Sequence, residues 1–199
     1  MNASVPDARR ARSRWQLVGL ALLFFGPLTA AFVLYYGFPS IRPGRSRAHG
    51  TLITPTRPLP EVVLHDAGGR PEPGLFVQKR WSLVYVDAGP CEEGCRDALA
   101  AMRVVHALLN ADASRVQRVL LYSGAAPDLA ALEPGDLHAL SLDGEAGARV
   151  LAAFPAPAAG RIYIVDPHGN LVMSYPGDSG ARQGLLEDLR RLLVYSHIG

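Results

Sequence analysis

The feature that most constrains this chain is an uncharged apolar run near its N-terminus. From Leu17 to Phe38 there are 22 residues without a charged side chain. A helix that rises about 1.5 Å per residue covers about 33 Å over that length, enough for a hydrocarbon core of about 30 Å. Trp15 and Tyr36 lie near its two ends, where amphipathic rings settle at the headgroups. The run predicts one membrane-spanning helix at residues 16–38, because the apolar region of a cleaved signal peptide is shorter.

Arginines flank the predicted span on both sides, and their distribution sets its orientation. The excess lies on the N-terminal side, which favours a cytoplasmic N-terminal segment of residues 1–15. The clusters also suit phospholipid headgroups, and the net charge of +2 indicates no nucleic-acid partner. The arginines in question are Arg9, Arg10, Arg12 and Arg14 before the span, and Arg42, Arg45 and Arg47 after it.

The rest of the chain divides into a linker and one domain. Residues 39–57 are rich in Pro, Gly and Arg, which predicts an extended linker. Residues 58–199 are enough for one domain with its own core. Strands and helices alternate there, which predicts an α/β fold with an open mixed sheet flanked by helices. Strands are expected at 61–65, 81–87, 116–122, 161–166 and 171–175, and helices at 92–109, 145–154 and about 185–193; residues 128–144 are left as a short helix or turns.

The chain has only two cysteines, Cys91 and Cys95, too few for a disulfide scaffold. They follow the strand expected at 81–87 and open the next helix. The unpaired N–H groups and the positive dipole end at the start of a helix favour a thiolate. The neighbouring carboxylates of Glu92 and Glu93 disfavour it, because they raise the pKa of the thiol. Since the two sulfurs are one helical turn apart, they face the same side and are close enough to bridge or to share a soft metal ion.

Two further residues are candidates beside the cysteines. Asp87, four residues before Cys91, is interpreted as a strand-end or turn residue, with a proton acceptor beneath the thiols as the alternative. His138 lies between two expected helices and is the candidate third ligand for a metal ion. The chain has no Gly-rich phosphate loop, no His-rich metal box and no G-x-S-x-G motif, which argues against nucleotide enzymes and hydrolases.

The order of these motifs resembles a known family. A strand runs into C-x-x-x-C at a helix start, and a strand, a D-P-x-G turn and a returning strand follow, with Tyr163–Gly169 carrying the turn. This arrangement is similar to the thioredoxin-like fold and, within it, to the SCO/SenC type of membrane-anchored copper chaperone for cytochrome c oxidase. The resemblance covers about residues 58–196 and implies a thioredoxin-like domain.

The chain departs from that family's pattern at three positions. Family members bind copper through two cysteines and a histidine about nine residues before the proline of the turn, and here that position is Ala158. The proline that follows the second cysteine in the family is replaced by Arg96. Redox thioredoxins carry a cis-proline directly before the same strand, where this chain has Gly160, and Pro155 or Pro157 could serve instead only with a shifted loop. The distal histidine and the cis-proline are therefore expected to be missing.

The resemblance implies a role in cytochrome c oxidase biogenesis, at the inner membrane of a bacterium and with the domain in the periplasm. Cys91 and Cys95 would be the working pair, either in thiol–disulfide exchange or in Cu(I) handling. Oxidase subunits or other assembly factors would be the partners of such an assembly factor. Two alternatives stay open: a non-catalytic docking protein with a static disulfide, and a general membrane-tethered thiol oxidoreductase.

Overall fold

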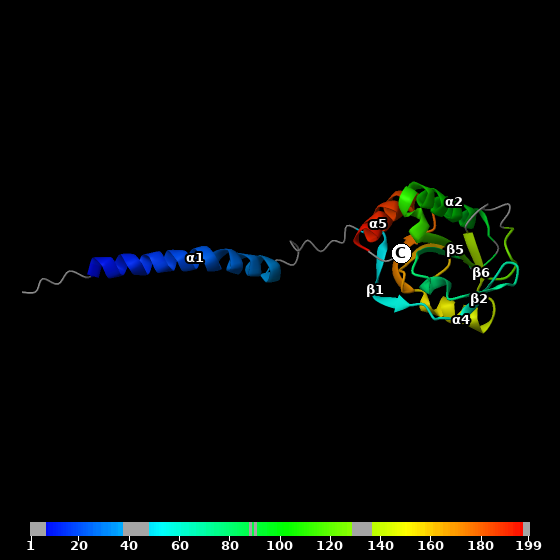
Figure 1. Ribbon diagram of the computed structural model, residues 1–199, viewed down its shortest axis with the longest axis horizontal. Coiled ribbons are helices and arrows are strands. Elements are labelled where there is room, and N and C mark those ends of the chain that lie inside the picture. The colour runs from blue at the N-terminus through cyan, green and yellow to red at the C-terminus, as the bar shows by residue number, and fades with distance from the viewer. Residues whose placement is uncertain (1–6, 38–47, 88, 90, 129–136, 197–199) are drawn as a thin grey trace, which may run out of the picture. The chain divides into compact units, whose positions relative to one another are not determined.

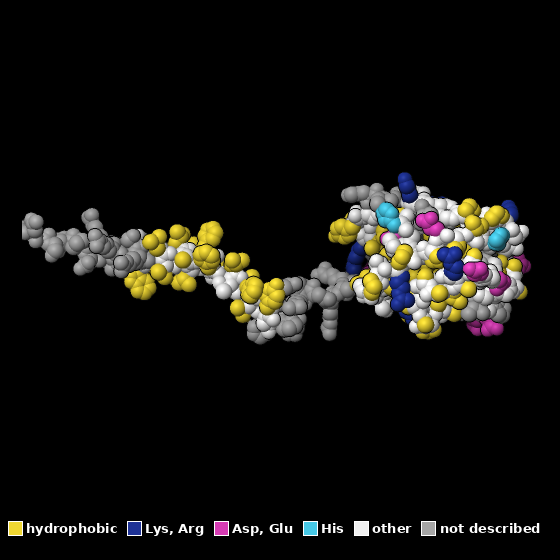
Figure 2. Space-filling view, turned by 90° about the horizontal axis from the view of Figure 1, so that it is seen from below, with side chains coloured by type: hydrophobic (Ala, Val, Ile, Leu, Met, Phe, Trp, Pro, Cys, Tyr) yellow, Lys and Arg dark blue, Asp and Glu magenta, His cyan; other side chains and the backbone are white. Residues whose placement is uncertain are grey.

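The computed structural model describes residues 7–37, 48–87, 89, 91–128 and 137–196, in two compact units of residues 1–47 and 48–199 (Figure 1). In the first unit, α1 (Asp7–Gly37) contains Pro27 and a 20-residue stretch, Trp15–Leu34, of mean hydropathy 2.3. Hydrophobic side chains lie along the described surface of this helix (Figure 2). A helix that is apolar all round suits a lipid environment, and α1 is long and apolar enough to cross a membrane.

The second unit is built on one mixed sheet. Its eight described strands lie in the order β1-β8-β7-β4-β5-β6-β2-β3. The central strands β4, β5 and β6 are parallel, and β7 and β8 continue the sheet in antiparallel fashion. The strands are β1 (Thr51–Pro58), β2 (Val63–Asp66), β3 (Pro71–Pro73), β4 (Trp81–Val86), β5 (Val116–Tyr122), β6 (Leu137–Ser141), β7 (Arg161–Val165) and β8 (Asn170–Pro176).

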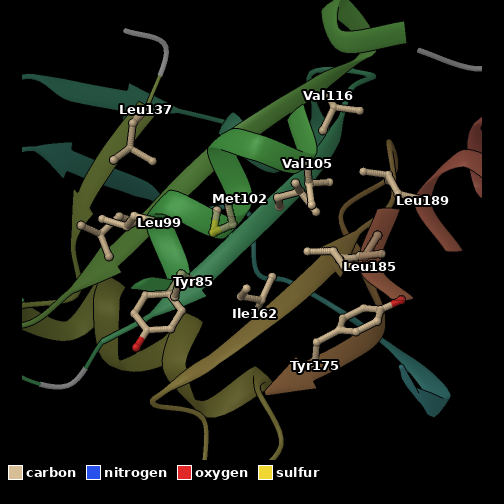
Figure 3. Packing of buried hydrophobic residues seen from close by; sticks show 14 of the residues in the cluster. Tyr85, Leu99, Met102, Val105, Val116, Leu137, Ile162, Tyr175, Leu185 and Leu189 are labelled. Carbon is tan, nitrogen blue, oxygen red and sulfur yellow. The ribbon is translucent and has the colours of Figure 1, made fainter. Parts of the chain in front are cut away.

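Helices cover both faces of this sheet, so the expected mixed sheet between helices is confirmed. On one face α2 (Glu93–Leu108) and α5 (Arg182–Tyr195) pack against Tyr85, Ile162 and Tyr175 (Figure 3). On the other face lie α4 (Gly144–Ala153) and the short 3-10 helix η2 (Leu75–Val77). Two further 3-10 turns are η3 (Asn110–Arg115) and η4 (Ser179–Ala181). Because β4 is buried on both faces, its sequence is almost continuously apolar.

The structure has three strands that the sequence interpretation did not predict, the shortest of which is the three-residue β3. Residues 51–57 were expected in the linker, but they belong to β1, which pairs with β8. β1 is an edge strand, where its prolines are tolerated, and those prolines made the segment look like a linker. β6 occupies Leu137–Ser141, where a helix or turns were expected; it is short and has no β-branched residue. The Leu129 and Leu132 part of that expectation lies outside the described residues.

Gly147 lies in α4, where the helix packs against the segment that follows β6. A Cβ atom at this position would overlap the backbone of Leu142, which cannot move aside as a flexible side chain can. We expect Gly147→Ala to lower the free energy of unfolding by about 3 kcal/mol. Gly94→Ala in α2 is the matched control, since a Cβ there would meet no atom within 4 Å. It should raise the free energy of unfolding by about 0.5–1 kcal/mol. Urea denaturation of the full chain in neutral detergent measures both, and equal effects would contradict this packing.

A buried carboxylate holds the residues that lead into β1. Asp188 of α5 is only 3% exposed, and it accepts hydrogen bonds from the N–H groups of His49 at 2.6 Å and Gly50 at 3.1 Å. The hydroxyl of Tyr175 donates a third, at 2.9 Å. The His49 ring also lies 3.0 Å from Glu187, the neighbour of Asp188 on α5. Together these contacts fix the start of the second unit on α5.

Burial raises the pKa of several tyrosines, most strongly that of Tyr175. There the hydrogen bond and the charge of Asp188 add to the effect of burial and hold the pKa of Tyr175 far above its usual range. Burial is also the leading cause of the raised pKa values of Tyr85, Tyr122 and Tyr163. A phenol whose pKa is raised by folding contributes stability that is complete below its unfolded pKa of about 10 and is lost as the pH rises above that value.

Alkaline titration should therefore lower stability through Tyr175. Above pH 10 this tyrosine is ionised in the unfolded chain and protonated in the folded one. Through this one group, the free energy of unfolding should fall by about 1.4 kcal/mol for each pH unit above 10. Tyr175→Phe should lower stability at pH 7 and remove this share of the slope between pH 10 and 11. Urea denaturation at several pH values measures the slope, and an unchanged slope in the variant would contradict the assignment.

Candidate functional site

The two cysteines lie at the N-terminal end of α2, which follows the carboxyl end of β4. Cys91 comes two residues before Glu93, the first residue of α2, and Cys95 lies in the first turn of that helix. Their sulfurs are joined in a disulfide, with the Cα atoms 5.1 Å apart. That separation is within the range that disulfides adopt. The strand-to-helix connection thus places both cysteines beside the carboxyl end of the central strand β4.

The two sulfurs differ in how they meet solvent. Cys91 is half-buried, whereas Cys95 is 3% exposed and belongs to the core between α2 and the sheet. Disulfide exchange begins with attack by an external thiolate on an accessible sulfur. Access therefore favours Cys91 as the sulfur that a partner reaches and Cys95 as the one that stays within the domain.

Asp87 is the charged neighbour of this disulfide. Its N–H donates to the carbonyl of Leu121 at 2.8 Å, which extends the β4–β5 ladder, and its Oδ1 accepts from the N–H of Gly89 at 3.3 Å. A carboxylate oxygen of Asp87 and the two sulfurs all lie within 4.8 Å of one another. The residue is thus a strand-end residue, as interpreted from the sequence, and also a direct neighbour of both sulfurs. Among the described residues, these are the one group of three or more His, Cys, Asp or Glu side chains close enough to share a metal ion, and the sulfurs could do so only after the disulfide is reduced.

Tyr85 and two glycines lie near the same carboxyl end of β4. After burial, the charge of Asp87 is the second cause of the raised pKa of Tyr85. Gly160 donates its N–H to the carbonyl of Val86 at 2.9 Å, and its own carbonyl accepts from Gly177 at 3.0 Å. A Cβ atom on Gly177 would lie 2.6 Å from the Gly160 oxygen and 2.8 Å from the Tyr85 ring, so only glycine allows this approach.

The loop before β7 carries the positions of the family's histidine and of the thioredoxin cis-proline. Gly160, which stands in the cis-proline position of redox thioredoxins, has a φ of 73°, a value that the proline ring excludes. The same loop contains a cis peptide bond between Ala156 and Pro157, three residues before Gly160, so the position directly before β7 has no proline, as expected, and the loop carries its cis-proline earlier. Ala158, in the position of the family's histidine, packs against the cluster beneath α4 and offers no metal ligand.

The structure does not bring His138 to the cysteines. His138 lies in β6 and pairs with Val119, whose side chain belongs to the cluster on the α4 face of the sheet. The cysteines belong to the cluster on the α2 face. Because paired residues of parallel strands point to the same side, His138 points away from the sulfurs. It lines a surface pocket of about 210 Å³ with Asp66 and Glu72, among others.

Known proteins share this fold. The apo Sco1 protein from Thermus thermophilus superposes with a TM-score of 0.59 at 19% identity, over 75% of this chain and 99% of that one. A SCO1/SenC family lipoprotein from Bacillus anthracis gives 0.55 at 14% identity, over 70% and 98%. Yeast Sco1 with copper bound gives 0.54 at 15% identity, over 71% and 93%. No curated protein matches the sequence.

These superpositions establish the fold, and the sequence itself establishes the family. Residues 81–196 match a family described as the transmembrane-like, thioredoxin-like, C-terminal domain. That match covers more than half of the 199 residues and includes both cysteines and Asp87. The chain therefore belongs to the transmembrane-like, thioredoxin-like C-terminal domain family, and its domain has the thioredoxin-like fold of Sco proteins.

Proposed function

We propose that this chain is a membrane-anchored, periplasmic thiol–disulfide exchange protein that assists the assembly of cytochrome c oxidase. The observation that carries the proposal is the disulfide between half-buried Cys91 and buried Cys95 at the start of α2. One accessible and one sheltered sulfur, beside a carboxylate, is an arrangement that exchange can use. α1 would hold the domain at the bacterial inner membrane, with the N-terminus in the cytoplasm.

The exchange can be written with all atoms and electrons accounted for. A thiolate of a partner protein attacks Cys91 Sγ, a new S–S bond forms to the partner, and the Cys91–Cys95 bond breaks with Cys95 leaving as a thiolate. A second partner thiolate then attacks the partner's own sulfur in the mixed disulfide and releases Cys91. The partner's two thiols are oxidised to a disulfide, the chain's disulfide is reduced to two thiols, and two protons pass from one to the other. The reverse sequence reduces a partner.

The link to oxidase assembly rests on the Sco-like fold. One similar structure is that of BsSco, which is described as having a disulfide switch and as a member of the Sco family of cytochrome c oxidase assembly proteins. It superposes with a TM-score of 0.55 at 16% identity, over 71% of this chain and 96% of that one. This chain has a disulfide in a domain of the same fold. A thiol-bearing oxidase subunit or another assembly factor is accordingly the proposed partner.

Complementation tests the proposal in cells. The gene is deleted in the organism that encodes the chain, and wild-type, Cys91→Ser or Arg149→Gln chains are returned. We expect oxidase activity to fall on deletion and to recover with wild-type and with Arg149→Gln, whose exposed side chain on α4 is far along the sequence from the site. Cys91→Ser should fail although it accumulates in the membrane. Full rescue by Cys91→Ser would leave a docking protein with a static disulfide as the better account.

Cu(I) handling is the second candidate, and the position of Asp87 favours it. Once reduced, Cys91 and Cys95 would supply two soft thiolate ligands, and the Asp87 carboxylate lies close enough to add an oxygen ligand, which is harder than the histidine used by Sco proteins of the resembled type. Copper would be cargo, received from and passed to a partner. Anaerobic titration of the reduced full chain against a Cu(I) chelator tests this role. One tightly bound Cu(I), weakened in Asp87→Asn and lost in Cys91→Ser, would support it, and no binding by the wild type would exclude it.

Asp87→Asn should also change thiol reactivity. A carboxylate within 4.8 Å of both sulfurs disfavours a second negative charge on either of them. Removing that charge should therefore speed alkylation of the reduced pair by iodoacetamide at pH 7, by about three- to tenfold. Asp97→Asn, an exposed change on α2, serves as the control and should leave the rate within about twofold. A slower rate in Asp87→Asn would indicate that the carboxylate instead accepts a thiol proton.

A further inference from the structure

A pocket of about 300 Å³ lies between β1 and the loop before β7, and the proposed exchange does not use it. β1 pairs regularly with β8 at Thr51 and Leu52 and again at Arg57, with a register shift between these points. The pocket is lined by this irregular part of β1 together with Pro155–Pro157, Arg161 and Ser174. Its volume is at the lower end of the range for small-molecule sites.

Two arginines give the pocket its chemical character. Arg161 donates from Nη2 to the hydroxyl of buried Ser174 at 3.0 Å, which holds the guanidinium in place. Arg57 is exposed and has no partner among the described residues. Neither guanidinium is paired with a described carboxylate. The pocket thus contains two positive charges whose N–H groups have spare hydrogen-bonding capacity.

The other lining groups complete the pattern. Thr51 and Thr54 add hydroxyls beside Ser174, while Ile53 and Pro157 supply apolar surface. Guanidinium groups match the geometry of carboxylate and phosphate oxygens and bind them through charge-assisted hydrogen bonds. Hydroxyls provide further donors to the same oxygens. No metal, thiol or general base belongs to this set, so its chemistry is binding.

We propose that this pocket binds a compact oxyanion, a carboxylate or a phosphate, between Arg57 and Arg161. The site lies on the α4 side of the sheet, since Ser174 and Arg161 share the face of Tyr163, and it is therefore separate from the disulfide on the α2 side. The oxyanion is either that of a free small molecule or that of a phospholipid headgroup, and both present the same group to the arginines.

Isothermal titration of the full chain in neutral detergent tests the proposal with three probes. These are inorganic phosphate, succinate, and phosphatidylglycerol added to the micelles. We expect saturable one-to-one binding of at least one probe, with a Kd of about 1 mM or tighter. Arg57→Gln and Arg161→Gln should each weaken that binding about tenfold or more. Binding of phosphate or succinate would identify a free anion, and binding of phosphatidylglycerol alone would identify a headgroup.

Arg149→Gln is the matched control, because it removes the same charge from an exposed position on α4 that does not line the pocket. Its affinity should equal that of the wild type. If Arg161→Gln fails to fold without the bond to Ser174, Arg57→Gln decides the matter, since its side chain is exposed and supports no other group. The proposal is overturned if no probe binds, or if Arg149→Gln weakens binding as much as Arg57→Gln does.

Discussion

Cys91→Ser is expected to abolish thiol–disulfide exchange. The substitution removes the half-buried cysteine, which is the more accessible of the two, and leaves only Cys95, which is 3% exposed. We expect the rate at which the reduced chain reduces a model disulfide to fall by at least about a hundredfold, to the background level. The domain should remain folded, because losing so short a disulfide loop costs only about 2 kcal/mol. Reduction of a fluorescent disulfide peptide by the reduced full chain measures the rate.

Cys95→Ser provides the discriminating control. This variant keeps Cys91 but cannot resolve a mixed disulfide, so it should accumulate a covalent adduct with the partner, visible on a non-reducing gel. Cys91→Ser should give no such adduct. Equal trapping by both variants would contradict the roles that their exposure assigns, and trapping by neither would indicate a static bridge.

Asp188→Ala is expected to cause the largest loss of stability. The carboxylate accepts N–H groups from His49 and Gly50 and the O–H of Tyr175, and its removal leaves these donors without their acceptor. Hydrogen bonds to a charged group contribute about 1.5–3 kcal/mol each, and breaking a buried polar network costs about 3–5 kcal/mol in total. We therefore expect a loss of about 3–5 kcal/mol in the free energy of unfolding.

Two variants control for this prediction. Asp188→Asn keeps one acceptor oxygen and should lose about half as much. Glu187→Ala removes a neighbouring carboxylate of α5 that is partly exposed and paired with His49, and it should cost less than about 1 kcal/mol. Urea denaturation followed by Trp81 fluorescence compares the three. Equal losses in Asp188→Ala and Glu187→Ala would show that the buried network does not hold the start of the domain.

The sequence predicted the centre of the fold better than its edges. β4 and β5 are buried on both faces, so their apolar runs are dense and their positions followed directly from the pattern. β1 and β6 were missed for a physical reason. β1 is an edge strand that tolerates prolines and exposes most of its residues, and β6 has five residues with little β propensity. Their pairing with β8 and β5 is a tertiary effect that local sequence does not encode.

The candidate site was likewise predicted where it depends on local sequence and missed where it depends on tertiary structure. The spacing of Cys91 and Cys95 on a helix start predicted that the sulfurs would meet, because helical geometry is local. His138 was chosen because its segment was left as a short helix or turns that could reach the cysteines, whereas the segment forms β6, whose pleat turns His138 to the opposite face. Asp87 was recognised at the strand end, but its approach to both sulfurs depends on the path of the loop before α2.

The reduction potential of the Cys91–Cys95 couple tests the central claim most directly. The full chain in neutral detergent is equilibrated with glutathione and dithiothreitol buffers, and the reduced fraction is counted by thiol alkylation and mass spectrometry. An exchange-active pair should titrate between about −270 and −120 mV, the range of known thiol oxidoreductases. A potential below about −300 mV is that of a structural disulfide, and it would contradict the account.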